Sequence, residues 1–257
     1  MSRFALILDY SFSAVTKNWK AVALFFLIII FLVLLHLVPV LSAVGQVILS
    51  LVGTQLQVYY GKKFLEAKSR EELISFLENS TVKKIYTENI QVSSGLFLAS
   101  FLVTTLLSVL SVALLFLTGL AYDFKNPESL QGALWYALLY LLIVVTLWST
   151  YLYLYPLGVG YVLTKESFGE AFLGFFRIFT PTFLAKSLRF AYFKLVFLGG
   201  ILFAVFSLLG IIFAVTVILL PLAAAVLYRL AVFFGALSAE CYRVTFLESD
   251  NGAGVDQ

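Results

Sequence analysis

The chain has 257 residues, of which 62% are hydrophobic and only 12% are charged. Soluble domains are about 45–50% apolar and about 25% charged, so this composition excludes a soluble globular protein and makes the lipid bilayer its solvent. The net charge of +3 is too small and too scattered to indicate a nucleic-acid partner, and a single cysteine excludes an intramolecular disulfide or a thiolate metal cluster.

Apolar runs of about 20 residues, the length that crosses a bilayer, recur along the chain. The first run is longer than the hydrophobic region of a signal peptide, so we expect a retained helix rather than a cleaved leader. In the turn before the fourth run, Asn126 is predicted as an N-cap with Pro127 at the first helical position. The predicted spans are 21–38, 40–60, 95–122, 128–155, 190–213 and 214–238. Residues 1–247 would form a single transmembrane domain, and 248–257 a disordered C-terminal tail.

The basic residues fall on one side of this topology. With the N-terminus inside, 16 of the 17 lysines and arginines lie in inner segments or at inner helix ends, and only Lys125 lies in an outer turn. Basic residues concentrate on the cytoplasmic side of membrane proteins, and an odd number of spans would spoil this bias. We therefore predict an all-α, polytopic transmembrane helix bundle of the cell membrane, with six spans and both termini cytoplasmic.

Three inner segments have the pattern of short amphipathic helices. In the first, one helical face carries Phe4, Leu8, Phe12, Val15 and Trp19. Capping boxes, Ser-x-x-Glu, begin the other two at Ser69 and Ser167. The apolar residues that follow the boxes are Leu73, Ile74 and Leu77 in one segment, and Phe172, Phe175, Phe176 and Phe179 in the other. We predict interfacial helices in the headgroup plane; cytosolic helices that pack on the bundle are the alternative. Each segment precedes a helical hairpin, which suggests a threefold repeat.

Several of these segments also carry a resemblance. They are Tyr10-Ser11-Phe12 and Lys17-Asn18-Trp19-Lys20 before the first span, Pro156 to Tyr161, Ser167-Phe168 with Ala171, and the end of the last hairpin, Gly235 to Arg243. Together they resemble a family of prokaryotic six-helix membrane proteins of unknown function, which is distantly similar to the membrane domain of glycerophosphoryl diester phosphodiesterases. The resemblance brings no catalytic residues. The chain has no soluble phosphodiesterase domain, so that activity is not implied.

Polar residues recur every three or four positions in three spans. The stripes are Ser42, Gln46, Ser50, Gly53, Thr54 and Gln57 in the second span, Ser100, Thr104, Ser108 and Ser111 in the third, and Tyr140, Thr146, Thr150 and Tyr153 in the fourth. Polar groups in a membrane face protein or a water-filled cavity. On one interpretation the hydroxyls bond to their own helix and the glutamines hold helices together. On the other, a polar cavity is lined by Gln46, Ser50, Thr54, Gln57, Thr104 and Ser108.

Two cations lie inside the apolar runs of the last two spans, Lys194 and Arg229. At matching depth on antiparallel helices they would repel each other, and an anionic lipid headgroup would compensate both. We predict that they converge on one groove at the inner headgroup level; the alternative is that each side chain snorkels to the interface. Ala231, Gly235 and Ala239 form a small-residue seam, suited to internal packing or to a dimer contact.

Motifs of enzymatic catalysis are not found in the sequence. The one histidine, His36, is predicted near the outer end of the first span, no span has paired carboxylates, and no glycine-rich phosphate loop is present. We expect no catalytic residue, metal ligand or cofactor, and membrane lipids as partners. The predicted function is a non-enzymatic lipid-binding or membrane-organising role. The alternative is a small-solute transporter or channel that uses the polar stripes.

Overall fold

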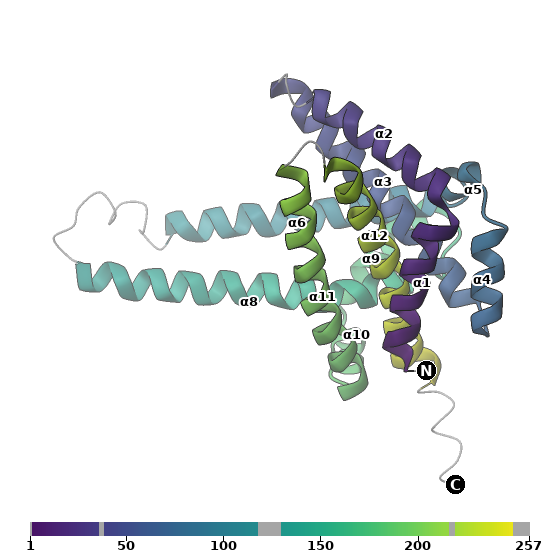
Figure 1. Ribbon diagram of the computed structural model, residues 1–257. Helices are drawn as coiled ribbons and strands as arrows, with labels where there is room; N and C mark the ends of the chain where they lie inside the picture. The colour runs from purple at the N-terminus through teal and green to yellow at the C-terminus, as the bar shows by residue number, and fades with distance from the viewer. Residues whose placement is uncertain (1, 36–38, 118–129, 216–218, 249–257) are drawn as a thin grey trace, which may run out of the picture.

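The computed structural model describes residues 2–35, 39–117, 130–215 and 219–248, and within these ranges every regular element is a helix (Figure 1). The long helices are α2 (Trp19–Leu35), α3 (Pro39–Glu66), α6 (Ile90–Leu117), α8 (Leu130–Val162), α11 (Phe190–Val215) and α12 (Leu220–Tyr242). The short elements are α1 (Arg3–Lys17), α4 (Arg70–Glu78), α5 (Val82–Thr87), α9 (Phe168–Phe175) and α10 (Pro181–Ser187), with a 3₁₀ turn at Phe176–Phe179 and a π turn at Arg243–Leu247. The prediction of an all-α fold is confirmed.

Five of the long helices are long and apolar enough to cross a membrane, and α2 gives a sixth span when it is counted together with α1, from which it is bent by 80°. The chain is therefore a multi-pass membrane protein. The helices differ from the predicted spans by a few residues at their ends: α3 continues to Glu66, and α12 begins at Leu220 and continues to Tyr242. His36, the predicted turn around Lys125, Asn126 and Pro127, and residues 249–257 of the predicted tail lie outside the described residues.

The fourth span was predicted to cover residues 128–155, but the helix does not end at the proline that follows. Helix α8 continues through Pro156 to Val162. A proline inside a helix removes one backbone hydrogen bond, and other donors must satisfy the carbonyls near it. The Tyr192 hydroxyl of α11 donates to the Tyr153 carbonyl, one turn before the proline. A neighbouring helix thus supplies a donor that the sequence of α8 could not reveal.

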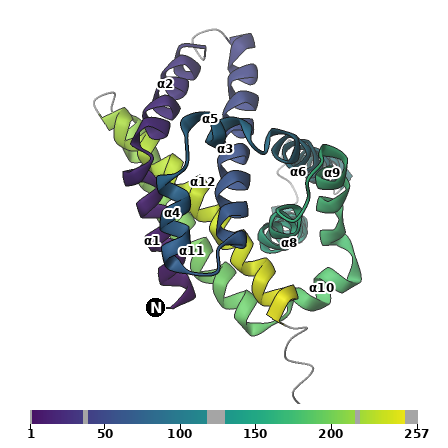
Figure 2. The ribbon, with the colours of Figure 1, turned by 90° about the vertical axis from the view of Figure 1, so that its right-hand side faces the viewer.

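The long helices form three hairpins, α2–α3, α6–α8 and α11–α12, that leave one common base in different directions. In Figure 1 the α6–α8 hairpin runs to the left while the other two run upward, and in Figure 2 it is seen nearly end-on. Burial follows this arrangement. In the apolar segment of α12, 44% is buried inside the protein, whereas in that of α8 only 11% is buried. The base is a packed core, and beyond it the hairpins expose apolar side chains as lipid-facing helices do.

Helix α12 lies at the centre of the base, where glycines allow two helices to cross it closely. A Cβ atom on Gly235 would lie 2.2 Å from the carbonyl oxygen of Gln57 on α3, and one on Gly160 of α8 would lie 2.2 Å from that of Ser238. Only glycine permits such contact between backbones. The small-residue seam around Gly235 is therefore an internal packing face, and the alternative of a dimer contact there does not hold.

Both predicted capping boxes are present. The Ser69 hydroxyl accepts from the backbone N–H of Glu72 at 3.2 Å, and the Glu72 carboxylate accepts from the N–H of Lys68 at 2.8 Å. The second box repeats this geometry, with Ser167 and Glu170 bonded at 3.3 Å. The order of a capped short helix followed by a hairpin occurs three times. Three of the short helices pack on long helices: α1 on α12, α5 on α3, and α9 on α6.

The apolar faces of these segments are partly buried in the protein and partly exposed. In α4, Leu73 and Leu77 are buried. Phe12 of α1 and Trp19, the first residue of α2, are instead 56% and 62% exposed, because α1 turns a different face toward α12 and α3. The side chains buried on that face are Ile7, Tyr10, Ser11 and Ala14. Phe179 is also exposed, since the 3₁₀ turn after α9 changes the helical register.

Candidate functional site

The bend between α1 and α2 is formed by Asn18. Its N–H donates to the carbonyl of Ala14 at 3.1 Å, which ends α1, and its own carbonyl accepts from the N–H of Ala21 at 2.8 Å, which begins α2. Its side-chain amide donates to the hydroxyl of Tyr60 on α3, 3.1 Å away, and that hydroxyl is hydrogen-bonded to the hydroxyl of Tyr228 on α12 at 2.5 Å. The bend is thus fixed by buried polar groups of two other helices.

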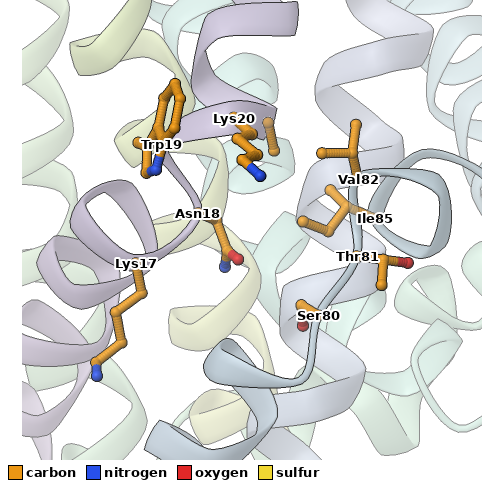
Figure 3. A pocket seen from close by; sticks show the side chains of 9 residues that line it. Lys17, Asn18, Trp19, Lys20, Ser80, Thr81, Val82 and Ile85 are labelled. Atoms are coloured by element: carbon orange, nitrogen blue, oxygen red, sulfur yellow. The ribbon is translucent and has the colours of Figure 1, made fainter.

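A pocket of about 500 Å³ opens beside this bend. One wall is the bend itself, Lys17 to Ala21, and the other is the connection from α4 to α5, Ser80 to Val82 with Ile85. Figure 3 shows the side chains of Asn18 and Lys20 on one side of the space, facing Val82 and Ile85 on the other. The pocket therefore has apolar side chains on one wall opposite basic and amide side chains on the other, a combination that suits an amphiphilic molecule.

Hydrogen bonds hold the second wall in place. The Thr81 hydroxyl accepts from the N–H of Lys84 at 3.3 Å and caps α5. The Ser80 hydroxyl donates to the carbonyl of Phe76 at 2.6 Å. The Tyr86 hydroxyl donates to the carbonyl of Ala21 at 2.9 Å and ties α5 to the start of α2. The hydroxyls of Ser80 and Tyr86 already donate to carbonyls, so the groups that remain to donate to a ligand are chiefly the two lysines.

The two lysines of the pocket differ in how their charge is compensated. The ammonium of Lys17 forms an ion pair with the carboxylate of Glu78. In the described part of the chain no carboxylate lies within ion-pair distance of Lys20, whose ammonium lies 5.8 Å from the centroid of the Trp19 ring. The pocket therefore carries a net positive charge. An anion entering it would meet one uncompensated cation and a second that it must share with Glu78.

An exposed apolar stripe begins directly beyond the pocket on α2. Its members recur at intervals of three or four residues from Lys20 onward and so share one helical face. They are Leu24, Leu27, Phe31 and Leu34, which are 37%, 59%, 56% and 58% exposed. Trp19, which is also exposed, stands beside Lys20 at the start of this stripe. A tryptophan and a lysine at the end of an apolar helix are typical of the headgroup level of a membrane.

Lys194 and Arg229 do not share a groove, so the predicted convergence is wrong. The guanidinium of Arg229 lies 5.4 Å from the ring centroid of Phe12 and 4.8 Å from that of Phe206, and its Nε is 3.4 Å from the hydroxyl of Ser11. Lys194 is exposed on α11, twelve positions before Phe206, which is about 18 Å along the helix. The antiparallel register of α11 and α12 thus sets the two cations at different depths.

The six polar-cavity candidates are also not gathered around one void. Thr54 bonds back to the carbonyl of Ser50 at 2.8 Å, and Ser108 to that of Thr104 at 2.9 Å. Gln46, Ser50 and Ser108 are exposed, and the two pockets described, beside the α1–α2 bend and between α1 and α4, are lined by other residues. Thr54 and Gln57 are buried, at 9% and 7% exposure. The side chain of Gln57 lies beside the hydroxyl of Tyr155, and its amide nitrogen has no partner among the described residues.

The polar stripe of α6 faces α8. The Ser111 hydroxyl accepts from the indole N–H of Trp148 at 3.2 Å, and the hydroxyls of Thr104 and Tyr151 lie 3.5 Å apart. This confirms, for α6, the interpretation in which polar groups bond to their own helix or hold helices together. Within the described ranges no group of three or more histidines, cysteines or carboxylates is placed to hold a metal ion.

Comparison with protein-family models, with curated proteins and with solved structures finds no match. The resemblance to a six-helix family stays a prediction, and the functional argument depends on the pocket itself. Sequence reasoning did not select the pocket residues as a site. The signal was present in Lys17-Asn18-Trp19-Lys20, a basic and aromatic cluster next to an apolar span, but nothing in the sequence placed Ser80 to Ile85 opposite it.

Proposed function

We propose that the protein is a non-enzymatic, lipid-binding membrane protein that holds the phosphate of an anionic phospholipid in the pocket beside the α1–α2 bend. The observation that carries this proposal is Lys20, a cation without a carboxylate partner in the described part of the chain, in a pocket next to an exposed apolar stripe. The lipid phosphate pairs with Lys20. One acyl chain then lies along α2 from Leu24 to Leu34.

The size and chemistry of the pocket support this assignment. A volume of about 500 Å³ is within the usual range for small-molecule sites and accommodates a phospholipid headgroup. Each basic residue near the surface of an anionic membrane contributes about 1 kcal/mol of attraction. Lys17 adds to this attraction when it exchanges Glu78 for the phosphate. The polar side chains of α6 and α8, by contrast, bond to each other and hold these two helices together. The transporter alternative therefore has less support.

The first test measures lipid affinity. The protein in phosphatidylcholine nanodiscs is titrated with fluorescent phosphatidylglycerol, and Lys20→Gln is compared with the unchanged chain. Loss of one ammonium contact of about 1 kcal/mol should weaken binding about fivefold, and Lys17→Gln with Lys20→Gln should weaken it further. Lys68→Gln, which removes the same charge at an exposed position outside the pocket, is the matched control and should leave the affinity unchanged.

Three outcomes would contradict the proposal. An equal loss in Lys68→Gln would mean that the affinity reflects total charge rather than a site. Displacement of the fluorescent lipid by soluble glycerol 3-phosphate would mean that the pocket recognises a free phosphate ester, whereas a lipid site requires the acyl chain as well. Retained affinity in the double lysine variant would show that the pocket is not the lipid site.

The proposal also includes an orientation, with the pocket and both termini on the cytoplasmic side. The basic residues of the inner segments support it, because positive charge concentrates in that compartment. In a chain whose Cys241 is replaced by alanine, a cysteine introduced at Lys68 should stay unmodified by a membrane-impermeant maleimide in intact cells and react after permeabilisation. A cysteine at Lys125, predicted outside, should react in both cases. Labelling at position 68 in intact cells would show that the orientation is the opposite of the one proposed.

A further inference from the structure

The outer half of α3 presents a polar face with no partner in the described structure. Gln46 and Ser50 are exposed, and a Cβ atom added to Gly53 would meet no heavy atom within 4 Å. With Ser42, these residues recur every three or four positions and share one helical face. The side-chain amide of Gln46 has no hydrogen-bond partner among the described residues. This face is distinct from the buried one, where Gly45 lies.

The position of Gln46 makes its isolation costly. It lies seven residues after Pro39, where α3 begins, which is about 10 Å along a helix that is apolar enough to cross a membrane. At that depth no water is available to the amide, and an amide without a partner in hydrocarbon costs several kcal/mol. A polar group in such a place is expected to find a partner in another protein segment.

Among the described residues, the α6–α8 hairpin does not supply that partner. The polar stripe of α6 is already bonded to α8 through Ser111 and Thr104, and the hydroxyl of Ser108 is bonded to its own helix. The exposed hydroxyl of Thr146 on α8 likewise donates to the carbonyl of Leu142 at 2.7 Å. Moreover, the α6–α8 hairpin leaves the base in a different direction from α3 (Figures 1 and 2).

We propose that the polar face of α3 binds the same face of a second copy of this chain, so that the protein forms a homodimer through two α3 helices. Two copies inserted with the same topology have parallel α3 helices, and a twofold axis then brings Gln46 of one copy against Gln46 of the other. A carboxamide both donates and accepts, so two of them can satisfy each other. Ser42, Ser50 and Gly53 are small and allow the helices to approach closely.

The proposal is tested by cross-linking. In a chain with Cys241→Ala, single cysteines are introduced at Gln46 and at Val44, and native membranes are oxidised with copper phenanthroline. Val44 is the matched control because it is 49% exposed, at nearly the same depth, but two residues away and hence on almost the opposite side of the helix. Q46C should form a disulfide-linked dimer, and V44C should remain largely monomeric. Equal cross-linking at both positions, or none at Gln46, would overturn the proposal.

A second variant separates dimerisation from folding. Gln46→Leu replaces the amide with an apolar side chain that lipid tolerates, so the monomer should stay folded while the dimer weakens. Loss of an interhelical amide pair of about 1 kcal/mol should raise the dimer dissociation constant about fivefold, measured by single-molecule photobleaching in liposomes at decreasing protein density. An unchanged constant would contradict the proposal. So would an intramolecular disulfide between Q46C and S108C, which would show that the α6–α8 hairpin closes over this face instead.

Discussion

Replacing Gly235 with alanine should destabilise the protein by about 3 kcal/mol, at the upper end of the usual cost of overpacking. The added Cβ atom would lie 2.2 Å from the carbonyl oxygen of Gln57 and 3.1 Å from the backbone nitrogen of Gly61. Both contacts are with backbone, which cannot move aside as a flexible side chain can. Helices α3 and α12 must therefore separate along the crossing, and the buried side chains around it lose contact.

The measurement is the apparent melting temperature of a fluorescent fusion, followed by size-exclusion chromatography after heating in detergent. Gly200→Ala on α11 is the matched control, because nothing lies within 4 Å of the position of its Cβ atom. Alanine favours a helix over glycine by about 1 kcal/mol, so this variant should be as stable as the unchanged chain or more so. A melting temperature for Gly235→Ala equal to that of Gly200→Ala would show that the base tolerates a wider crossing.

Features that depend on a few neighbouring residues could be predicted from the sequence. The six apolar runs and the two capping boxes are of this kind, since each is set by composition or by contacts within one helical turn. The directions of the three hairpins could not be predicted in this way. They depend on where the helices cross, and the crossings are set by Gly235 and Gly160 against the backbone of another helix. The sequence alone does not show which helix a given glycine will contact.

The candidate site shows the same difference between local features, which could be predicted, and tertiary contacts, which could not. The depth of Arg229 and Lys194 was inferred by counting from the ends of two spans, which assumes that the helices are level. In the structure Gly199 packs on Leu237 and Phe206 on Phe233, and this register places Arg229 far from Lys194. Lys20 and its neighbours were visible as a cluster. The pocket needed the α4–α5 connection as its second wall, and only the tertiary structure brings that segment to the bend.

The C-terminal end of α12 carries a buried charge network that fixes the base. The carboxylate of Glu240, whose side chain is only 4% exposed, pairs with Arg243 at 3.1 Å and with Arg3 at 3.2 Å. The guanidinium of Arg243 also donates to backbone carbonyls at the end of α3, those of Phe64, Leu65 and Ala67, at 3.1, 3.2 and 3.4 Å. The last carbonyls of a helix have no partner within the helix, so one arginine both caps α3 and neutralises Glu240.

Replacing Arg243 with methionine should therefore cost about 3 kcal/mol, since it leaves a buried carboxylate with one partner and the end of α3 uncapped. The same change at Arg3, whose side chain is 51% exposed, should cost less than about 1 kcal/mol, as is usual for exposed pairs. Melting temperatures in detergent measure both. Adding Glu240→Gln to the Arg243 variant should restore part of the loss, because a neutral amide needs no cation. If it restores none, the lost stability comes from the carbonyls of α3 rather than from the buried charge.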